Sequence, residues 1–383
     1  MDNKQRECFE KAYDTAAGLI LKATDEFTES YPEAASINNF YRPVEITDWT
    51  CGFWTGEVWL AYEKTGDEKL KRTAEIEVKD FNQRIKEKRL VNHHDMGFLY
   101  SPSCVAAYKL TGSETGKEAA LLAADNLLGR FQEKGQFVQA WGELGAEDNY
   151  RLIIDCLLNM PLLFWAGEVT GDPKYAKKAK AHIRTAMKCI IREDNSTYHT
   201  YFFDKNTGKP LRGVTHQGYR DGSAWARGQA WGVYGSALAY KFLRDQEYVD
   251  IFCRLTDYFL EHLPKNKIPY WDFDFTDGSD EPRDSSAAAI AVCGMLEMSK
   301  YLPEEKAQYY TRRAEELMEA LISECAVTDP AVSNGLLLHG TYAKSSPYNT
   351  CNDNGVDECV AWGDYFYMEA LTRLMKDWEP YWY

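Results

Sequence analysis

Two kinds of helical pattern alternate along the chain. Amphipathic stretches rich in charged residues cover about 6–28, 67–89, 114–132, 173–191, 245–263 and 304–324. Each is followed by a more apolar, small and aromatic stretch, at about 50–65, 96–111, 155–170, 225–243, 285–301 and 362–376. A helix with one polar face lies at a surface, and a helix that is apolar nearly all round is buried. The pattern therefore predicts six outer and six inner helices in alternation.

Six such pairs close naturally into an (α/α)6 barrel, and we predict this all-α architecture for residues 1–383 as a single domain. An open solenoid of two-helix repeats is the competing architecture. The uniformly apolar inner stretches and the irregular steps between them favour the closed barrel. Inner stretches end in Thr65-Gly66, Thr111-Gly112 and Thr170-Gly171, where glycine can take a left-handed cap. Inserts near 133–153, 194–223, 264–284 and 325–361 are expected to form loops with short strands at one end.

Composition and charge limit the kinds of partner that we expect for this chain. The chain has 44 basic and 59 acidic residues, a net charge of −15, which argues against nucleic acid or an anionic membrane surface as partner. The N-terminal segment is charged rather than shaped like a secretory signal, and no window reaches the ~18 apolar residues of a membrane span. The ten cysteines form no CxxC pair, which is typical of reduced thiols. We therefore expect a cytoplasmic protein.

Polar and aromatic residues gather at the start of every inner stretch. Because all inner helices run in the same direction, these starts converge at one mouth of the barrel, as a ligand site requires. The residues concerned are Trp49, Trp54, His94, Asp95, Asp155, Trp225, Arg227, Gln229, Arg283, Asp284, Ser285, Trp362 and Asp364.

Two aspartates are candidates for acid–base chemistry. Asp155 stands in the apolar run RLIIDCLLNMPLLFW, where it is either a helix N-cap or a catalytic acid whose pKa is raised by desolvation. A second carboxylate nearby would help to keep it protonated, and Asp95 in NHHDMGF is the candidate, although it too could be a cap. The tandem His93-His94 lacks the four-residue spacing of helical metal ligands, so we expect no metal ion.

The segment from His216 to Trp231 is the richest in functional groups. Its glycines lack the spacing of a phosphate-binding loop. Trp225 and Trp231 are either core residues or walls of a pocket. Arg227 lies two residues into a buried helix and needs an anion, for which a substrate carboxylate would suit its fork geometry. Trp49, Trp54 and Trp141 could offer flat faces to sugar rings.

Other chemistries find little support. No GxSxG elbow is present, and no cysteine stands beside a plausible histidine base. The segment Asp353–Glu358 lacks the ligand spacing of a calcium loop and is expected to be a solvated turn. No cofactor is expected.

Ten motifs together resemble the unsaturated glucuronyl hydrolases, glycoside hydrolase family 88. They are DWTCGFWTGEVWLAYE, HHDMGFLYSPS, QAWGELG, RLIIDCLLNMPLL, STYHTYFFD, THQG, WARGQAWGVYG, PYWDF, PRDSSA and WGDYFYMEAL. The resemblance implies an (α/α)6 barrel that removes a 4,5-unsaturated uronic acid from the non-reducing end of oligosaccharides left by polysaccharide lyases.

The resemblance also assigns roles. Asp155 matches the general acid/base and Asp95 the second essential carboxylate. Residues that match the family's pocket are Trp49, Trp141, His199, Gln217, Trp225, Arg227, Trp231 and, less closely, Tyr342; His94 and His216, in the same motifs, complete the expected substrate-binding set. Family members that favour sulfated fragments carry Arg in place of His216, so the sulfation of the partner sugar is left open.

Three alternatives differ in function. A related barrel hydrolase acts on unsaturated galacturonyl-rhamnose, but normally lacks the paired HHD and IIDCLLN motifs. A non-catalytic carbohydrate-binding helical scaffold would not need both Asp95 and Asp155. A sugar isomerase would need a histidine pair, which His199 and His216 could supply.

Overall fold

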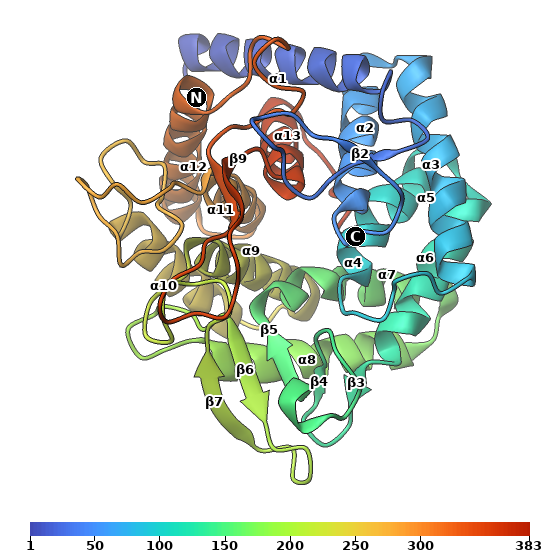
Figure 1. The fold of residues 1–383 in the computed structure, drawn as a ribbon, viewed down its shortest axis with the longest axis vertical. Coiled ribbons are helices and arrows are strands. Elements are labelled where there is room, and N and C mark those ends of the chain that lie inside the picture. The colour runs from blue at the N-terminus through green and yellow to red at the C-terminus, as the bar shows by residue number, and fades with distance from the viewer.

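The computed structural model describes residues 1–383, and its helices form two concentric rings (Figure 1). The outer ring consists of α1 (Asn3–Ala23), α3 (Glu68–Lys86), α6 (Glu114–Leu128), α8 (Pro173–Ile190), α10 (Glu247–Glu261) and α12 (Glu304–Glu324). The inner ring consists of α2 (Cys51–Thr65), α4 (Met96–Tyr100) with α5 (Ala106–Thr111), α7 (Met160–Thr170), α9 (Ala226–Leu243), α11 (Ser285–Ser299) and α13 (Ala361–Met375). The predicted alternation of outer and inner helices is confirmed.

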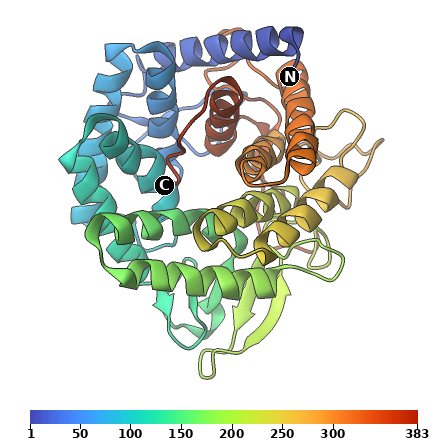
Figure 2. The ribbon, with the colours of Figure 1, turned by 180° about the vertical axis from the view of Figure 1, so that it is seen from behind.

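The ring is closed rather than open. The first helix, α1, packs against both α2 and the last helix, α13. Seen from either side, the blue N-terminal helices meet the orange and red C-terminal ones (Figures 1 and 2). An open solenoid is therefore wrong, and the (α/α)6 barrel is the architecture of this chain.

Inner helices are buried along most of their length because they have partners on every side. In α2, every residue from Cys51 to Ala61 is buried, whereas α3 buries only one face. Glycine allows the closest approaches: a Cβ at Gly52 would collide with the backbone of Phe98 and Leu99 in α4. The Thr-Gly ends behave as predicted, with Gly66, Gly112 and Gly171 in the left-handed region at φ of 70°, 70° and 71°.

Two inner helices begin or continue irregularly. Residues Ser101–Val105 form a π-helical turn between α4 and α5, with Pro102 in it, and residues Ile154–Asn159 form a 3-10 turn that leads into α7. Asp155 lies in this 3-10 turn, and Asp95 immediately precedes α4 without capping it by a side-chain hydrogen bond. Helix capping thus does not account for either aspartate.

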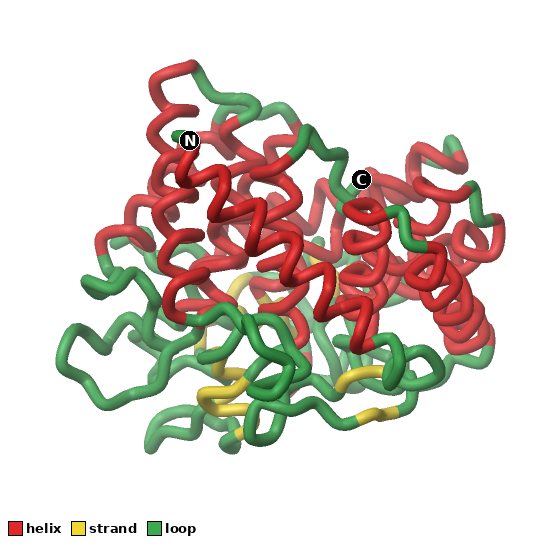
Figure 3. The backbone as a smooth tube through the Cα atoms, turned by 90° about the horizontal axis from the view of Figure 1, so that it is seen from above, coloured by secondary structure: helices red, strands yellow, loops and turns green.

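The short strands and most of the long loops lie on one side of the helices, and short connections lie on the other (Figure 3). The strands are β1 (Tyr31–Pro32), β2 (Pro43–Val44), β3 (Phe131–Gln132), β4 (Phe137–Val138), β5 (Arg151–Ile153), β6 (Thr200–Phe203), β7 (Pro210–Val214), β8 (Gly340–Ala343) and β9 (Asn354–Glu358). They form the antiparallel sheets β1-β2, β3-β4, β5-β6-β7 and β8-β9.

The expectation of a solvated turn at Asp353–Glu358 is wrong. Residues 354–358 are strand β9, paired with β8. The carboxylate of Glu358 accepts hydrogen bonds from the hydroxyl of Ser36 (2.5 Å) and the backbone amides of Asn38 (2.8 Å) and Asn39 (2.7 Å). The sequence of this acidic segment alone does not indicate a strand, because the residues that hold it in place are distant in the sequence.

One contiguous core of 107 buried hydrophobic residues runs through the barrel. The C-terminal residues turn back into the ring, where Trp382 is fully buried against Phe366 and donates a hydrogen bond to Glu369 (2.7 Å). Tyr381 donates to Glu63 of α2 (2.6 Å). None of the helices combines the length and apolar sequence that a membrane span needs.

Candidate active site

A pocket of about 810 Å³ opens where the inner helices begin, among the strand-bearing loops. Its lining comes from segments that are far apart in the sequence. The lining residues are Thr47, Asp48, Trp49, Leu90, Asn92, His93, His94, Asp95, Trp141, Asp155, His216, Gln217, Trp225, Arg227, Trp231, Tyr342, Ala343, Thr350, Cys351, Asn352 and Asn354. The predicted convergence of inner-helix starts therefore produces a deep pocket lined by polar and aromatic side chains.

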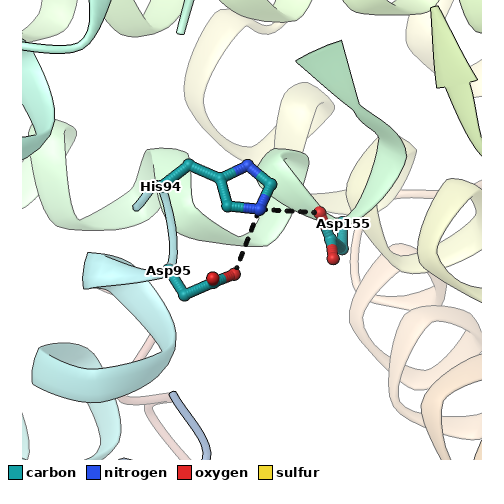
Figure 4. Close-up of side chains that lie close together, drawn as sticks. All are labelled: His94, Asp95 and Asp155. Atoms are coloured by element: carbon teal, nitrogen blue, oxygen red, sulfur yellow. Dashed lines mark ion pairs between the residues drawn. The ribbon is translucent and has the colours of Figure 1, made fainter. Parts of the chain in front are cut away.

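His94 lies between the two aspartates (Figure 4). Its Nε2 atom is 3.3 Å from Oδ1 of Asp95 and 3.6 Å from Oδ1 of Asp155. On the other side of Asp95, Nδ1 of His93 lies 3.0 Å from Oδ2. Asp155 Oδ1 is buried without a hydrogen-bond partner, whereas both oxygens of Asp95 have histidine neighbours.

These surroundings make the two carboxyl groups unequal. Burial raises the pKa of Asp155 well above its usual value, and the nearby charge of Asp95 raises it further, while Arg227 opposes both only in part. Burial also acts to raise the pKa of Asp95, but His94, His93 and Arg130 outweigh it, and the net direction is downward. The surroundings thus favour the protonated form of Asp155 and the ionised form of Asp95.

The imidazole between them is neutral near pH 7, because burial lowers the pKa of His94 to about 4. Ligand atoms of His94, Asp95 and Asp155 lie within 4.8 Å of one another, a grouping that could hold a metal ion. The spacing within His93–Asp95 alone predicts no metal ion, but Asp155 adds a third ligand atom from the 3-10 turn before α7. A metal ion here would compete with the proton of Asp155.

Aromatic side chains form one wall of the pocket. Trp49 stacks on Trp362 at 5.2 Å between ring centroids, and its Nε1 donates a hydrogen bond to the hydroxyl of Tyr342 (3.0 Å). On another side, Trp225 meets His199 edge-on at 4.9 Å. These contacts fix flat faces along the pocket, an arrangement suited to sugar rings.

Arg227 already has an anion within the protein. Its guanidinium donates to Asp284 (2.5 Å) and to the backbone carbonyls of Thr341 (2.6 Å) and Tyr342 (2.5 Å). It lies between the rings of Trp225 and Trp362, 4.5 and 4.8 Å from their centroids. The anion inferred for Arg227 from the sequence is therefore at least in part Asp284, although Arg227 also lines the pocket.

Of the ten residues expected to bind substrate, His199 alone does not line the pocket. It is buried behind Gln217, with its Nε2 3.3 Å from Oε1 of that side chain. Gln217 donates in turn to the carbonyl of Tyr342 (2.9 Å). His216 lies near the rim, with Nδ1 2.7 Å from the hydroxyl of Thr350.

Several other residues at the inner-helix starts serve the scaffold. Trp54 donates to the carbonyl of Phe27 and to Glu77 (2.9 and 2.8 Å), Gln229 donates to backbone carbonyls, and Asp364 accepts from Tyr41 (2.9 Å). Sequence reasoning missed the rim residues Asn92, Thr350 and Asn352, which line the pocket from loops, and Asn354, at the start of β9. Their one signal is polar, turn-forming composition, which many surface loops share.

The barrel and its paired unequal carboxyl groups define the class of an (α/α)6-barrel glycoside hydrolase. Residues 19–372 match the model of Glycosyl Hydrolase Family 88. The chain is 48% identical over 375 residues to the unsaturated chondroitin disaccharide hydrolase of Streptococcus agalactiae, covering 97% of this chain and 93% of that protein. It is 39% identical to the unsaturated glucuronyl hydrolase of Bacillus sp. (strain GL1), covering 98% and 99%.

The crystal structure of the unsaturated glucuronyl hydrolase from Streptococcus agalactiae superimposes with a TM-score of 0.94, at 48% identity, over 98% of this chain and 94% of that one. This chain belongs to glycoside hydrolase family 88. Both the resemblance seen in the ten motifs and the barrel it implies are confirmed.

Proposed function

We propose that this enzyme removes a 4,5-unsaturated uronic acid from the non-reducing end of glycosaminoglycan-type disaccharides by hydrating the C4=C5 bond. The observation that carries the proposal is the pair Asp155 and Asp95, one protonated and one ionised, in an aromatic-walled pocket. The activities named for the relatives are of the same kind.

The vinyl ether of the unsaturated sugar explains why such a pair suffices. Asp155 donates its proton to C4, which builds positive charge at C5 and on the ring oxygen. Water adds to C5 and gives its proton to the carboxylate of Asp155, so the acid is restored. The product is a hemiketal that opens and expels the partner sugar, without attack at the anomeric carbon. Asp95 stabilises the developing cation.

This chemistry differs from that of ordinary glycosidases, whose two carboxyl groups flank the scissile bond. Because C1 is not attacked, α- and β-linked unsaturated disaccharides should both be turned over. Turnover of only one anomer would contradict hydration at C5.

The test of the proposal is the loss of ultraviolet absorbance when an unsaturated chondroitin or hyaluronan disaccharide is hydrated. Wild type should bleach the chromophore, and Asp155→Asn should be slower by roughly 10²–10⁴-fold because it removes the proton donor. Asp148→Asn, an exposed change in a neighbouring loop, is the matched control. Equal bleaching by Asp155→Asn and wild type would exclude Asp155 as the acid. Faster turnover of unsaturated galacturonyl-rhamnose would favour the pectin-directed alternative.

The charge of the pocket favours an unsulfated partner sugar. No lysine lines it, and its one arginine, Arg227, is paired with Asp284. Burial lowers the pKa of His216, and the nearby charge of Arg151 lowers it further, so this rim residue is neutral near pH 7. We expect a higher kcat/KM for unsulfated than for sulfated disaccharides, and His216→Arg to narrow the difference; a sulfated substrate preferred by wild type would contradict this.

The whole chain is proposed to act as one catalytic domain in the cytoplasm. The continuous hydrophobic core supports the first part. The second is supported by ten cysteines that are all free thiols, as is usual in a reducing compartment. Chromatography of the domain after limited proteolysis, and fractionation of cells that produce it, test the two parts.

A further inference from the structure

Two arginines near the ends of outer helices are buried without a carboxylate partner. Arg84 lies in the last turn of α3 and is 0% exposed, and Arg130 lies just after α6 and is 2% exposed. No carboxylate oxygen is within 4.0 Å of either guanidinium. A buried guanidinium is costly unless its N–H groups find acceptors. The acceptors that each one finds therefore explain why it is there.

Arg84 binds two segments of the pocket rim. Its NH1 donates to the carbonyl of Asp48 (2.8 Å) and its NH2 to that of Thr47 (3.0 Å). Its NH2 also donates to Leu90 (3.0 Å) and its Nε to Arg89 (3.2 Å). Thr47, Asp48 and Leu90 all line the pocket. One planar group thus connects the segment before Trp49 to the segment that leads to the histidine–aspartate motif.

Arg130 makes the next connection around the rim. Its NH1 donates to the side-chain oxygen of Asn92. Its Nε donates to the carbonyl of Gln139 (3.0 Å), and its NH2 to those of Ala140 and Gly142, the latter at 3.1 Å. Ala140 and Gly142 flank Trp141, and Asn92 lies two residues before His94. The fork of Arg130 thus joins the segment of Asp95 to the loop of Trp141.

We propose that Arg84 and Arg130 are positioning residues that fix three rim segments, 47–49, 89–95 and 139–142, relative to one another, and so set where Trp49, Asp95 and Trp141 meet the substrate. The kinetic consequences of this proposal rest on the proposed function, but the fixing of the three rim segments by the two arginines does not. An arginine suits this task because it offers five N–H donors in one rigid plane, whereas lysine is a point charge on a flexible stem.

The two arginines differ in one respect that an experiment can use. Arg130 carries charge near the catalytic pair: it contributes to lowering the pKa of Asp95, which is also faced by His93, His94 and Asp155. Burial lowers the pKa of Arg130 to about 10, so it stays charged near pH 7. Arg84 is not one of the groups that lower the pKa of Asp95 most.

The first measurement is amide hydrogen exchange of the full-length enzyme, which does not depend on activity. Arg130→Met should speed exchange in residues 91–95 and 139–142, and Arg84→Met in residues 47–50 and 89–90. Arg312→Met, an exposed change on α12, is the control and should leave all of these segments unchanged. Unchanged exchange at the rim in both buried-site variants overturns the proposal, even if the enzyme acts on unsaturated disaccharides as expected.

The second measurement separates kcat from KM on an unsaturated disaccharide. Because a misplacement of about 1 Å can cost on the order of 10²-fold in rate, Arg130→Met should lower kcat strongly and raise KM, while Arg84→Met should mainly raise KM. Arg130→Lys should leave KM raised, since it restores the charge without the planar fork. If both variants have kcat and KM within about twofold of wild type and only their Tm is lower, the two arginines stabilise the fold and do not position the substrate-binding residues.

A further outcome is that wild type has no activity on unsaturated disaccharides while amide exchange in the rim segments still speeds up in the arginine variants. In that case the proposed function fails, but the positioning role of the arginines holds. The two failures are therefore distinguishable.

Discussion

At the scale of single residues, the pocket depends on a difference between two chemically identical side chains. Asp155 has an orphaned oxygen in an apolar 3-10 turn, and Asp95 is held between two histidines. Each group influences the other, because the charge of Asp95 is one reason that Asp155 keeps its proton. The two carboxyl groups therefore titrate as a pair.

Replacing Asp95 should move the pH profile in a defined direction. In the proposed mechanism activity requires protonated Asp155, so it should fall as pH rises through the raised pKa of that group. Asp95→Asn removes the negative charge that raises this pKa, and the alkaline limb of the residual kcat/KM should shift to lower pH. Rates of Asp95→Asn and wild type across a pH series provide the comparison. An alkaline limb that stays in place, or moves upward, would show that Asp95 does not act on Asp155 in this way.

Metal ions should inhibit rather than support the reaction. The ligand atoms of His94, Asp95 and Asp155 are close enough for Zn²⁺, but a bound ion would hold Asp155 in its ionised form. Turnover should survive dialysis against EDTA, and added Zn²⁺ should inhibit more strongly as pH rises, because protons leave the ligands. Loss of activity in EDTA that Zn²⁺ or another divalent ion restores would contradict this.

Pocket residues could be predicted from the sequence where they stand in a recognisable motif. They were harder to predict where their role depends on a side chain that is distant in the sequence. Asp95, Asp155 and Trp141 lie at the pocket as expected. The sequence could not tell that Arg227 is already paired with Asp284, because 57 positions separate the two along the chain. Nor could it tell Trp54, which bonds to the scaffold, from Trp49, which lines the pocket.

At the scale of elements, one helix contact sets the spacing of the aspartates. Gly97, in the first turn of α4, lies against the backbone of Asn159, and Asn159 Oδ1 accepts a hydrogen bond from the amide of Phe98 (2.9 Å). Asp95 lies two residues before this contact and Asp155 four residues before Asn159. The contact therefore couples the packing of two inner helices to the geometry of the pocket.

Gly97→Ala should disturb both stability and rate. Its Cβ would collide with Asn159, and such overpacking costs about 1–3 kcal/mol. Gly167→Ala in α7 is the matched control, since its Cβ would meet nothing closer than 3.6 Å. Thermal unfolding and kcat of the two variants should diverge, with only Gly97→Ala lowering both. Equal behaviour of the two would mean that the close approach does not set the aspartate spacing.

Elements with a strong local period were predictable, and those fixed by distant partners were not. Twelve helical stretches followed from amphipathic and apolar patterns, because each helix is defined by its own buried face. The π-helical turn at Ser101–Val105 interrupts one of them without a change in hydrophobicity. Strand β9 was misread because its order comes from β8 and from Glu358 binding the loop of Asn38, 320 positions away.

At the scale of the whole molecule, an enzyme of net charge −15 must admit an anionic sugar. The global field repels the substrate, and salt screens it over a Debye length of about 10 Å at 0.1 M. We expect kcat/KM to rise as ionic strength increases from low values, through a lower KM. Initial rates in a NaCl series at fixed pH provide the test. A steady fall in kcat/KM would mean instead that Arg227 and the local pocket charges dominate the encounter.

The insertion of the C-terminal residues into the ring has a consequence for biosynthesis. The barrel closes only when α13 packs against α1 and α2, and Trp382, the penultimate residue of the sequence, fills space beside α13. The ribosome still covers this segment when the first five helix pairs have emerged. Nascent chains therefore stay partly assembled, with their apolar inner faces open, until α13 has emerged from the ribosome. Chaperones therefore have the longest time to act on the open ring just before α13 reaches α1 and α2.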